Sequence, residues 1–211
     1  MRIERARWEA RYRAGEQPHD GPASSLLRRW LPGRPGGRAL DMATGLGRNA
    51  LYLARAGYRV DAVDIAPTAL REAARRGRRA GLHSIRWIAG DLDRWRPQRT
   101  RYDVVVNAFF LKRRLFRILK AAVKPGGLLI FETHLNTPTP DGAVCARRRL
   151  RPGELRRVFG DWEVLYAKDG LCRESGRMLA LGRIVARRPG PPQIGGSGEA
   201  PKTSRRSSKR R

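Results

Sequence analysis

The chain has 211 residues, of which 40% are hydrophobic, and a formal net charge of +27. This length and composition predict one well-buried domain rather than two. The sequence has no run of 18 apolar residues to span a membrane and no apolar secretion signal at its start, so we expect a cytoplasmic protein with no membrane partner. Two cysteines, Cys145 and Cys172, cannot form a disulfide framework, a zinc cluster or an iron–sulfur cluster.

Two interpretations of the charge remain open. A strongly basic chain is typical of proteins that bind nucleic acid or another polyanion. Arginine runs such as those in 75–79 and 147–149 are also typical of solvated helix faces. The basic segment 189–211 has almost no apolar residues, so we predict that it is disordered and binds nucleic acid at most weakly and without specificity. The folded domain is then expected over residues 1–188.

Helix-like and strand-like patterns alternate along this domain. The expected helices lie near residues 3–14, 22–31, 47–57, 67–80, 112–122 and 152–159. The expected strands lie near residues 38–42, 59–63, 85–89, 102–107, 127–133, 162–168 and 178–187. Such alternation predicts an α/β fold, with a mainly parallel sheet and helices on both faces. Only a turn region, 169–177, separates the last two strands, which predicts a hairpin and one antiparallel strand.

The first predicted helix carries two aromatic residues on one face. Trp8 and Tyr12 are four residues apart and therefore adjacent on a helix. They are candidates for a lid over a ligand, although ordinary packing of a terminal helix explains them as well.

A glycine turn follows the first predicted strand, at Asp41–Asn49. It brings a helix N-terminus and bare backbone close to a ligand. Gly45 and Gly47 with Ala50 also fit the looser dinucleotide-binding pattern. Asp41 favours a different ligand, because a carboxylate repels pyrophosphate but accepts from the ammonium of an amino acid linked to a sulfonium.

Polar residues end three further predicted strands. Asp64 lies 17 residues after Gly47, near the distance at which such folds place a carboxylate on ribose hydroxyls. Asp91 can accept from the exocyclic amine of adenine, and Asn107 ends the fourth strand. Because ligands of open sheets bind beyond the carboxyl ends of the strands, these residues predict one binding site.

With these features the chain resembles class I S-adenosylmethionine-dependent methyltransferases, and among them the small tellurite-resistance-type methyltransferases. The likeness covers roughly residues 5–188. It is carried by residues 40–54, 57–64, 102–106, the Lys-Pro-Gly-Gly turn 124–127, residues 151–157, and Trp162 with Glu163. It implies a Rossmann-like methyltransferase fold with seven strands, S-adenosylmethionine as cofactor, and a small-molecule methyl acceptor.

The resemblance also implies a cofactor site. Its expected residues are Asp41, Ala43, Thr44, Gly45, Gly47, Asn49, Asp64, Ile65, Asp91, Leu92 and Asn107. The family usually has glycine or cysteine where this chain has Thr44.

Catalytic groups are less well marked. Methyl transfer from a sulfonium needs mainly orientation of donor and acceptor, so we expect no nucleophile. His134, after the fifth strand, and Arg173, in the expected final turn, are weak candidates on the acceptor side. The three histidines, His19, His83 and His134, are too scattered to predict a metal site.

Parts of the sequence also fit three other functions. In methyltransferases that act on base amines, two prolines follow the asparagine at the position of Asn107, and here Ala108 and Phe109 replace them. We therefore interpret the run from Phe109 as apolar cover beside the cofactor. A nucleic-acid-binding module that retains the fold, and a nicotinamide-dependent oxidoreductase, remain as further alternatives.

Overall fold

The computed structural model of the protein describes residues 2–16, 21–34, 36–137 and 148–190. The predicted disordered segment lies outside the described residues except for 189–190, and so do Cys145 and His19. Within the described ranges, no helix has the length and apolar character needed to cross a membrane.

Seven strands form one sheet in the order β3-β2-β1-β4-β5-β7-β6. The strands are β1 (Arg38–Met42), β2 (Arg59–Asp64), β3 (Ile85–Ala89), β4 (Tyr102–Ala108), β5 (Val123–His134), β6 (Glu163–Glu174) and β7 (Arg177–Arg187). The first five strands pair in parallel, whereas β7 pairs antiparallel with β5 and β6. This confirms the predicted fold class.

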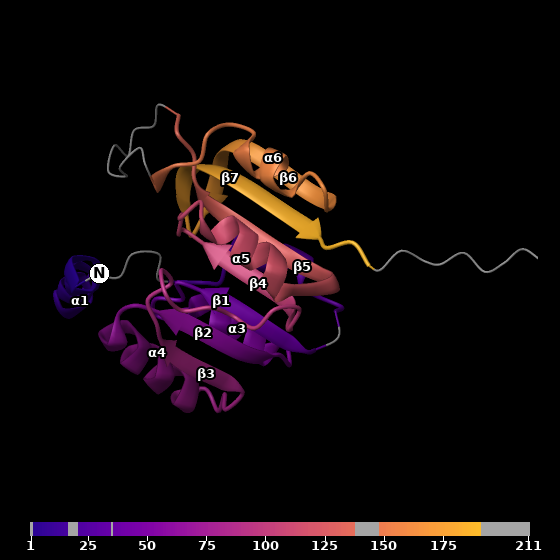
Figure 1. The fold of residues 1–211 in the computed structure, drawn as a ribbon. Helices are drawn as coiled ribbons and strands as arrows, with labels where there is room; N and C mark the ends of the chain where they lie inside the picture. The colour runs from indigo at the N-terminus through magenta and orange to yellow at the C-terminus, as the bar shows by residue number, and fades with distance from the viewer. Residues whose placement is uncertain (1, 17–20, 35, 138–147, 191–211) are drawn as a thin grey trace, which may run out of the picture.

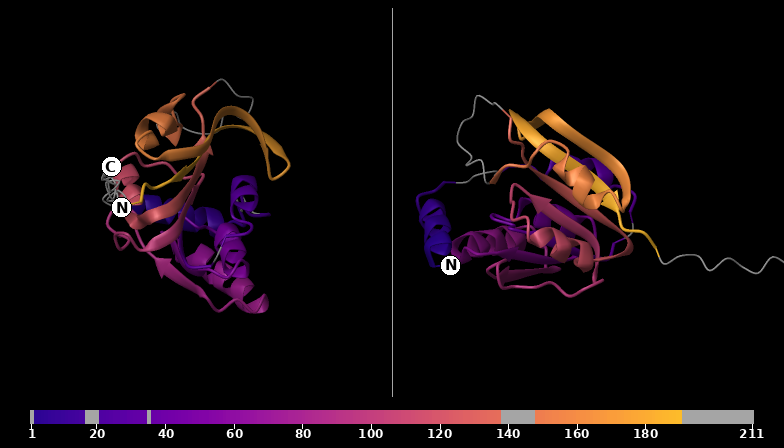
Figure 2. Two further views of the ribbon diagram at one scale, coloured as in Figure 1. Left: turned by 90° about the vertical axis from the view of Figure 1, so that its right-hand side faces the viewer. Right: turned by 45° about the horizontal axis from the view of Figure 1, so that its top comes forward.

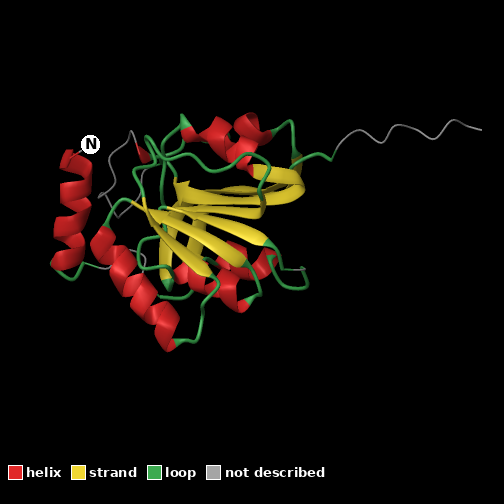
Figure 3. Cartoon of the chain, turned by 60° about the horizontal axis from the view of Figure 1, so that its bottom comes forward, coloured by secondary structure: helices red, strands yellow, loops and turns green. Residues whose placement is uncertain are grey.

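Helices pack on both faces of the sheet, as Figures 1 and 3 show. The helices are α1 (Arg2–Arg13), which lies at one end of the sheet rather than on a face, and α2 (Ser25–Trp30), α3 (Arg48–Arg55), α4 (Pro67–Arg79), α5 (Leu115–Ala122) and α6 (Glu154–Phe159). Each lies within or close to a predicted range. The hydroxyl of Ser24 accepts from the backbone N–H of Leu27, which explains why α2 begins there.

The core has two apolar layers, one on each side of the sheet. Leu27 of α2 and Leu53 of α3 pack on one face with Val104 and Ile130. The other face is covered by α5 and α6, whose aromatic residues meet edge to face, with the ring centroids of Phe116 and Phe159 5.9 Å apart. A sheet covered on both faces explains why the central strands β4 and β5 carry the continuous apolar runs 104–106 and 128–131.

The final hairpin differs from the prediction. The strands β6 and β7 extend until only Ser175 and Gly176 separate them, and both of these residues have positive φ, 48° and 80°. A two-residue turn of this kind matches the twist of paired strands, so the pairing continues to the tip. Cys172 and Arg173 therefore lie on β6 rather than in a turn, and the expectation of a turn over 169–177 is wrong.

The Lys-Pro-Gly-Gly segment forms the predicted turn inside a longer strand. Val123 pairs with Tyr102, and the next pair is Leu128 with Val104, so residues 124–127 loop out of the ladder. Gly126 has a φ of 75°, which favours glycine. Because the residue before this loop already pairs with β4, β5 begins at Val123, ahead of the predicted strand.

The strand order reverses between β1 and β4, which places a ligand site beyond their carboxyl ends. In Figures 1 and 2 the helix α1 lies across this end of the sheet, next to α4. The topology therefore brings the predicted strand-end residues and the predicted lid helix to the same place.

Candidate functional site

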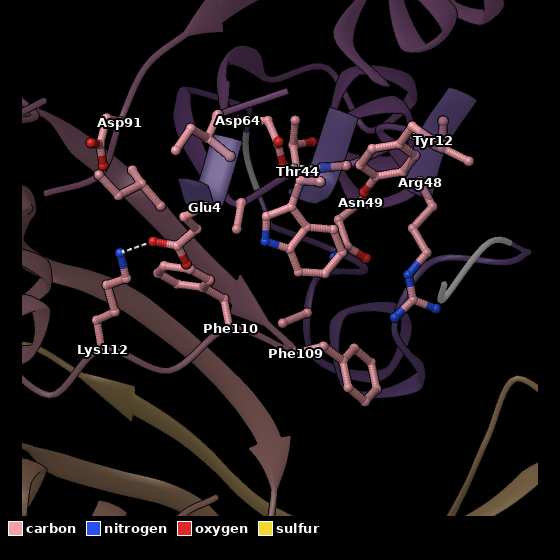
Figure 4. A pocket seen from close by; sticks show the side chains of 17 residues that line it. Glu4, Tyr12, Thr44, Arg48, Asn49, Asp64, Asp91, Phe109, Phe110 and Lys112 are labelled. Atoms are coloured by element: carbon pink, nitrogen blue, oxygen red, sulfur yellow. Dashed lines mark hydrogen bonds and ion pairs between the residues drawn. The ribbon is translucent and has the colours of Figure 1, made fainter. Parts of the chain in front are cut away.

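A pocket of about 820 Å³, part of it open to solvent, lies at this switch point. Figure 4 shows polar and aromatic side chains from α1, the glycine turn and the ends of β2 and β4 around it. The lining residues are Glu4, Trp8, Tyr12, Ala43, Thr44, Gly45, Leu46, Arg48, Asn49, Asp64, Ile65, Asp91, Leu92, Ala108, Phe109, Phe110 and Lys112.

The glycine turn has left-handed backbone at three positions. The φ angles are 52° at Ala43, 55° at Gly45 and 80° at Gly47. A Cβ on Gly45 would lie 2.8 Å from the hydroxyl oxygen of Tyr12, on the pocket side of the turn. A Cβ on Gly47 would instead lie 2.7 Å from the ring of Trp87. Gly45 thus keeps backbone open to the pocket, whereas Gly47 allows α3 to pack closely on β3.

Asp64 ends β2 at the pocket wall, with only 6% of its surface exposed. Its carboxylate accepts from the backbone N–H of Gly45, at 2.8 Å, and of Ala66, at 2.9 Å. Burial raises the pKa of Asp64, and the backbone donors oppose that rise. Since a carboxylate offers about four acceptor positions, Asp64 can hold the turn and still accept from ligand hydroxyls.

Asp41 is fully buried beneath the turn and does not line the pocket. The hydroxyl of Thr44 donates to its carboxylate. Burial raises the pKa of Asp41 to about 7, against the effect of that hydrogen bond. Thr44, the residue that departs from the family pattern, therefore supplies a donor to the strand-end carboxylate.

The other two strand-end residues differ in position. Asp91 lines the pocket and accepts from the backbone N–H of Asp93, at 2.9 Å. Asn107 is buried behind the wall, and its side-chain amide donates to the carbonyl oxygen of Phe110, at 2.7 Å. The asparagine thus shapes the loop that carries Phe109 and Phe110 into the pocket lining.

Helix α1 is tied across the pocket by an ion pair. The ammonium of Lys112, after β4, lies 2.8 Å from the carboxylate of Glu4 and 2.6 Å from that of Asp93. Figure 4 shows the pair between Glu4 and Lys112 at one end of the pocket. On the same face of α1, Trp8 and Tyr12 pack on the glycine turn and α4, which supports the lid interpretation.

A second contact fixes α1 to the start of α4. No side chain within α4 caps its N-terminus, because Ala66 occupies the N-cap position. The carboxylate of Glu9 accepts instead from the backbone N–H of Thr68, at 2.9 Å, and from its hydroxyl, at 2.6 Å. A carboxylate is favourable at a helix N-terminus, so this contact stabilises α4 and the lid together.

Eight of the eleven predicted cofactor residues line this pocket, and Asp41, Gly47 and Asn107 lie behind its wall. The prediction missed Arg48, although it stands within the glycine motif, and Lys112, whose partner Glu4 is 108 residues away. Glu4 itself could have been found, since it precedes Trp8 by four residues on the same helix face.

The weak catalytic candidates lie outside the pocket lining. The ring of His134, at the end of β5, is 5.4 Å from the ring of Phe109, so it stands just behind the lining. Arg173 is exposed on β6 near the hairpin tip, where it pairs with Met178.

Residues 39–127 match the family described as "Methyltransferase domain". The chain is 29% identical over 167 residues to "Hemagglutinin 1" of Eikenella corrodens, covering 72% of this chain and 55% of that protein. It is 38% identical over 87 residues to "Ribosomal RNA small subunit methyltransferase B" of Thermus thermophilus, covering 41% of this chain and 21% of that protein. The chain thus spans about half the length, or less, of these curated relatives.

Solved structures share the fold. TehB from Haemophilus influenzae superposes with a TM-score of 0.67 at 19% identity, covering 86% of this chain and 67% of that one. A SAM-dependent methyltransferase from Aquifex aeolicus gives a TM-score of 0.64 at 17% identity, covering 85% of this chain and 97% of that one.

Residues 39–127 therefore match a methyltransferase domain, and the chain has the Rossmann-like fold of these solved methyltransferase structures. Two solved structures of this fold, at 14% and 16% identity to this chain, are complexes with S-adenosyl-L-methionine and with S-adenosyl-L-homocysteine. The pocket fits such a group, because a bare Gly45 backbone faces a buried carboxylate, Asp64, at the switch point, and aromatic side chains of α1 cover them.

Proposed function

We propose that the protein transfers a methyl group from S-adenosylmethionine to a small-molecule acceptor, by holding donor and acceptor in line. The observation that carries this proposal is the position of α1. Its residues Glu4, Trp8 and Tyr12 line the pocket together with the strand-end carboxylates. A pocket covered by a helix suits an acceptor that can be enclosed rather than a polymer laid across an open groove.

Within this proposal each part of the cofactor has its own contacts. Asp64 accepts from the ribose hydroxyls, and Asp91 with Leu92 holds the adenine. The turn around Gly45, with Asn49, holds the methionine end. Asp41 supports that end from behind the turn, through Thr44, whose hydroxyl donates to it.

The cofactor supplies an electrophilic methyl group bound to a sulfonium sulfur, and after transfer that sulfur is part of a neutral thioether. The protein then has to position the acceptor and exclude water, and orientation of this kind contributes roughly 7–11 kcal/mol to the barrier reduction. Trp8 and Tyr12 exclude water from one side, while Phe109 and Phe110 do so from the loop after β4. We propose no nucleophile of the protein and keep His134 and Arg173 only as weak candidates for acceptor contacts.

Methylation of a base amine is the alternative that the net charge of +27 keeps open. In such enzymes the asparagine after the fourth strand grips the target amine. Here the amide of Asn107 donates to Phe110 in a buried position, which favours the small-molecule proposal. As further parts of the proposal, the acceptor is of the tellurite-resistance type, which the sequence motifs of residues 40–54 and 151–157 support, and the protein is cytoplasmic.

Methyl transfer from cofactor labelled at the methyl group tests the acceptor class directly. The purified protein is incubated with a panel of small thiols, oxyanions, amines and phenols, and in parallel with total RNA and with DNA. We expect label in a small-molecule product and none in nucleic acid. Label confined to RNA or DNA would refute the small-molecule acceptor, while leaving the cofactor assignment in place.

A further inference from the structure

One buried cation in the pocket lining has no role in holding the cofactor as proposed above. Arg48 is the first residue of α3 and lines the pocket, and its side chain is only 7% exposed. A guanidinium stays charged at any ordinary pH, so at this depth it requires anionic or carbonyl partners.

The partners of Arg48 leave part of its hydrogen-bonding capacity unused. Its Nη1 donates to the carbonyl oxygen of Pro22, at 2.9 Å, to the hydroxyl of Ser175, at 3.1 Å, and to the carboxylate of Glu174, at 3.4 Å. Its Nη2 is buried and has no hydrogen-bond partner among the residues that the structure describes. An unpaired donor on a buried cation is costly unless a ligand occupies it.

The negative charge of Glu174 is shared. Its carboxylate accepts from the hydroxyl of Ser25, at 2.6 Å, and from Nη2 of Arg183, at 2.9 Å, and both contacts are shorter than the one with Arg48. Arg183 in turn lies 3.0 Å from the carboxylate of Glu132. Burial and the charge of Glu174 raise the pKa of Glu132, whereas the charges of Arg183 and Arg48 oppose that rise. The two arginines thus share two carboxylates, and neither carboxylate pairs with Arg48 alone.

An aromatic ring stands beside the guanidinium. The guanidinium carbon of Arg48 lies 5.4 Å from the centroid of the Phe109 ring, and Figure 4 shows the two side chains adjacent along one wall of the pocket. Phe109 has a φ of 57°, a left-handed conformation that a bulky residue adopts only under constraint. Its ring also meets that of His134, at 5.4 Å. The backbone is thus strained at the residue that flanks Arg48.

We propose that Arg48 and Phe109 form the subsite for the methyl acceptor, and that this acceptor carries an anionic group which pairs with the guanidinium. The inference rests on the proposed function and adds the charge of the acceptor to it. The guanidinium binds an oxygen or sulfur of the anionic group, and the ring of Phe109 packs against the rest of the molecule. A neutral acceptor would leave the cation only partly compensated, so the subsite discriminates by charge.

Binding of two molecules of the same shape tests this charge preference. Benzoate and its neutral isostere benzamide are titrated into protein saturated with S-adenosylhomocysteine, and ligand-observed NMR gives their dissociation constants. In the wild type we expect benzoate to bind about tenfold or more tightly than benzamide, the scale of a hydrogen bond to a charged group. Arg48→Gln is expected to abolish this preference, and Arg48→Lys to reduce it because the planar fork is lost.

Arg55→Gln is the matched control, because Arg55 lies at the other end of α3 and is exposed. It should keep the wild-type preference. Equal affinities for the two probes in the wild type, or an unchanged preference in Arg48→Gln, would overturn the subsite. If thermal unfolding shows that Arg48→Gln is not folded, Arg48→Lys decides, and an unchanged preference there overturns it equally. Failure of S-adenosylhomocysteine to bind the wild type would instead refute the proposed function.

Discussion

Replacing Asp64 by asparagine should weaken ligand binding, and this loss of affinity can be measured separately from the loss of stability. Asp64 accepts from two backbone amides and is proposed to accept from ribose hydroxyls as well. Hydrogen bonds to a charged acceptor contribute about 1.5–3 kcal/mol, which corresponds to a loss of affinity of roughly 10- to 150-fold. Isothermal titration with S-adenosylhomocysteine measures this loss, and thermal unfolding measures the cost to the turn at Gly45.

Asp61 on the same strand provides the control. It is also buried, and its carboxylate accepts from Arg86, at 2.9 Å, and from the hydroxyl of Tyr102, at 2.7 Å, but it does not line the pocket. Asp61→Asn should lower the melting temperature and leave the dissociation constant near the wild-type value. The reasoning is refuted if Asp64→Asn binds as tightly as the wild type, or if both variants lose affinity equally.

Three further outcomes follow from the contacts around the pocket. Burial raises the pKa of Asp41 from 3.8 to about 7, so protonation of Asp41 stabilises the fold fully below about pH 4, and this stabilisation is lost as the pH rises through 7. The melting temperature of Asp41→Asn should therefore fall less between pH 5 and pH 8 than that of the wild type. Equal falls in the two proteins would contradict this. Lys112→Ala removes the contact with Glu4 and should speed dissociation of S-adenosylhomocysteine in stopped-flow experiments with only a small change in melting temperature, whereas an unchanged rate argues against the lid. Glu9→Ala leaves the start of α4 uncapped and should lower the free energy of unfolding in urea by about 0.5–2 kcal/mol, and Glu9→Gln should lower it less. An unchanged free energy of unfolding in both variants would mean that the contact with Thr68 does not stabilise the helix.

The sequence predicted the sheet and its strand ends well because both depend on local patterns. Asp64 and Asp91 follow apolar runs at the expected spacing, and the structure brings them into one pocket. The side-chain direction at a strand end depends on the backbone that follows, however. Asp41 turns behind the wall beside a left-handed Ala43, and Asn107 bonds to its own loop, and neither outcome has a local sequence signal.

Contacts between distant parts of the chain were beyond sequence reasoning. The pairing of Glu4 with Lys112, and of Glu9 with Thr68, requires α1 to lie across the end of the sheet. Arg48 illustrates a different limit. Its place in the glycine motif was visible, but its burial and its unpaired nitrogen follow from Glu174 at the far end of the chain. The hairpin itself was predicted, but the segment of β6 that carries Glu174 was predicted as part of its turn.

Binding of S-adenosylhomocysteine, with NADPH as the control, tests the cofactor assignment on which the whole account depends. At a hundredfold excess over its dissociation constant, a ligand of the folded state adds about 2.7 kcal/mol, or a rise of about 5–10 °C in melting temperature for a domain of this size. We predict this rise, with a matching calorimetric signal, for S-adenosylhomocysteine alone. A rise with NADPH and none with S-adenosylhomocysteine would contradict the account and favour an oxidoreductase on the same fold.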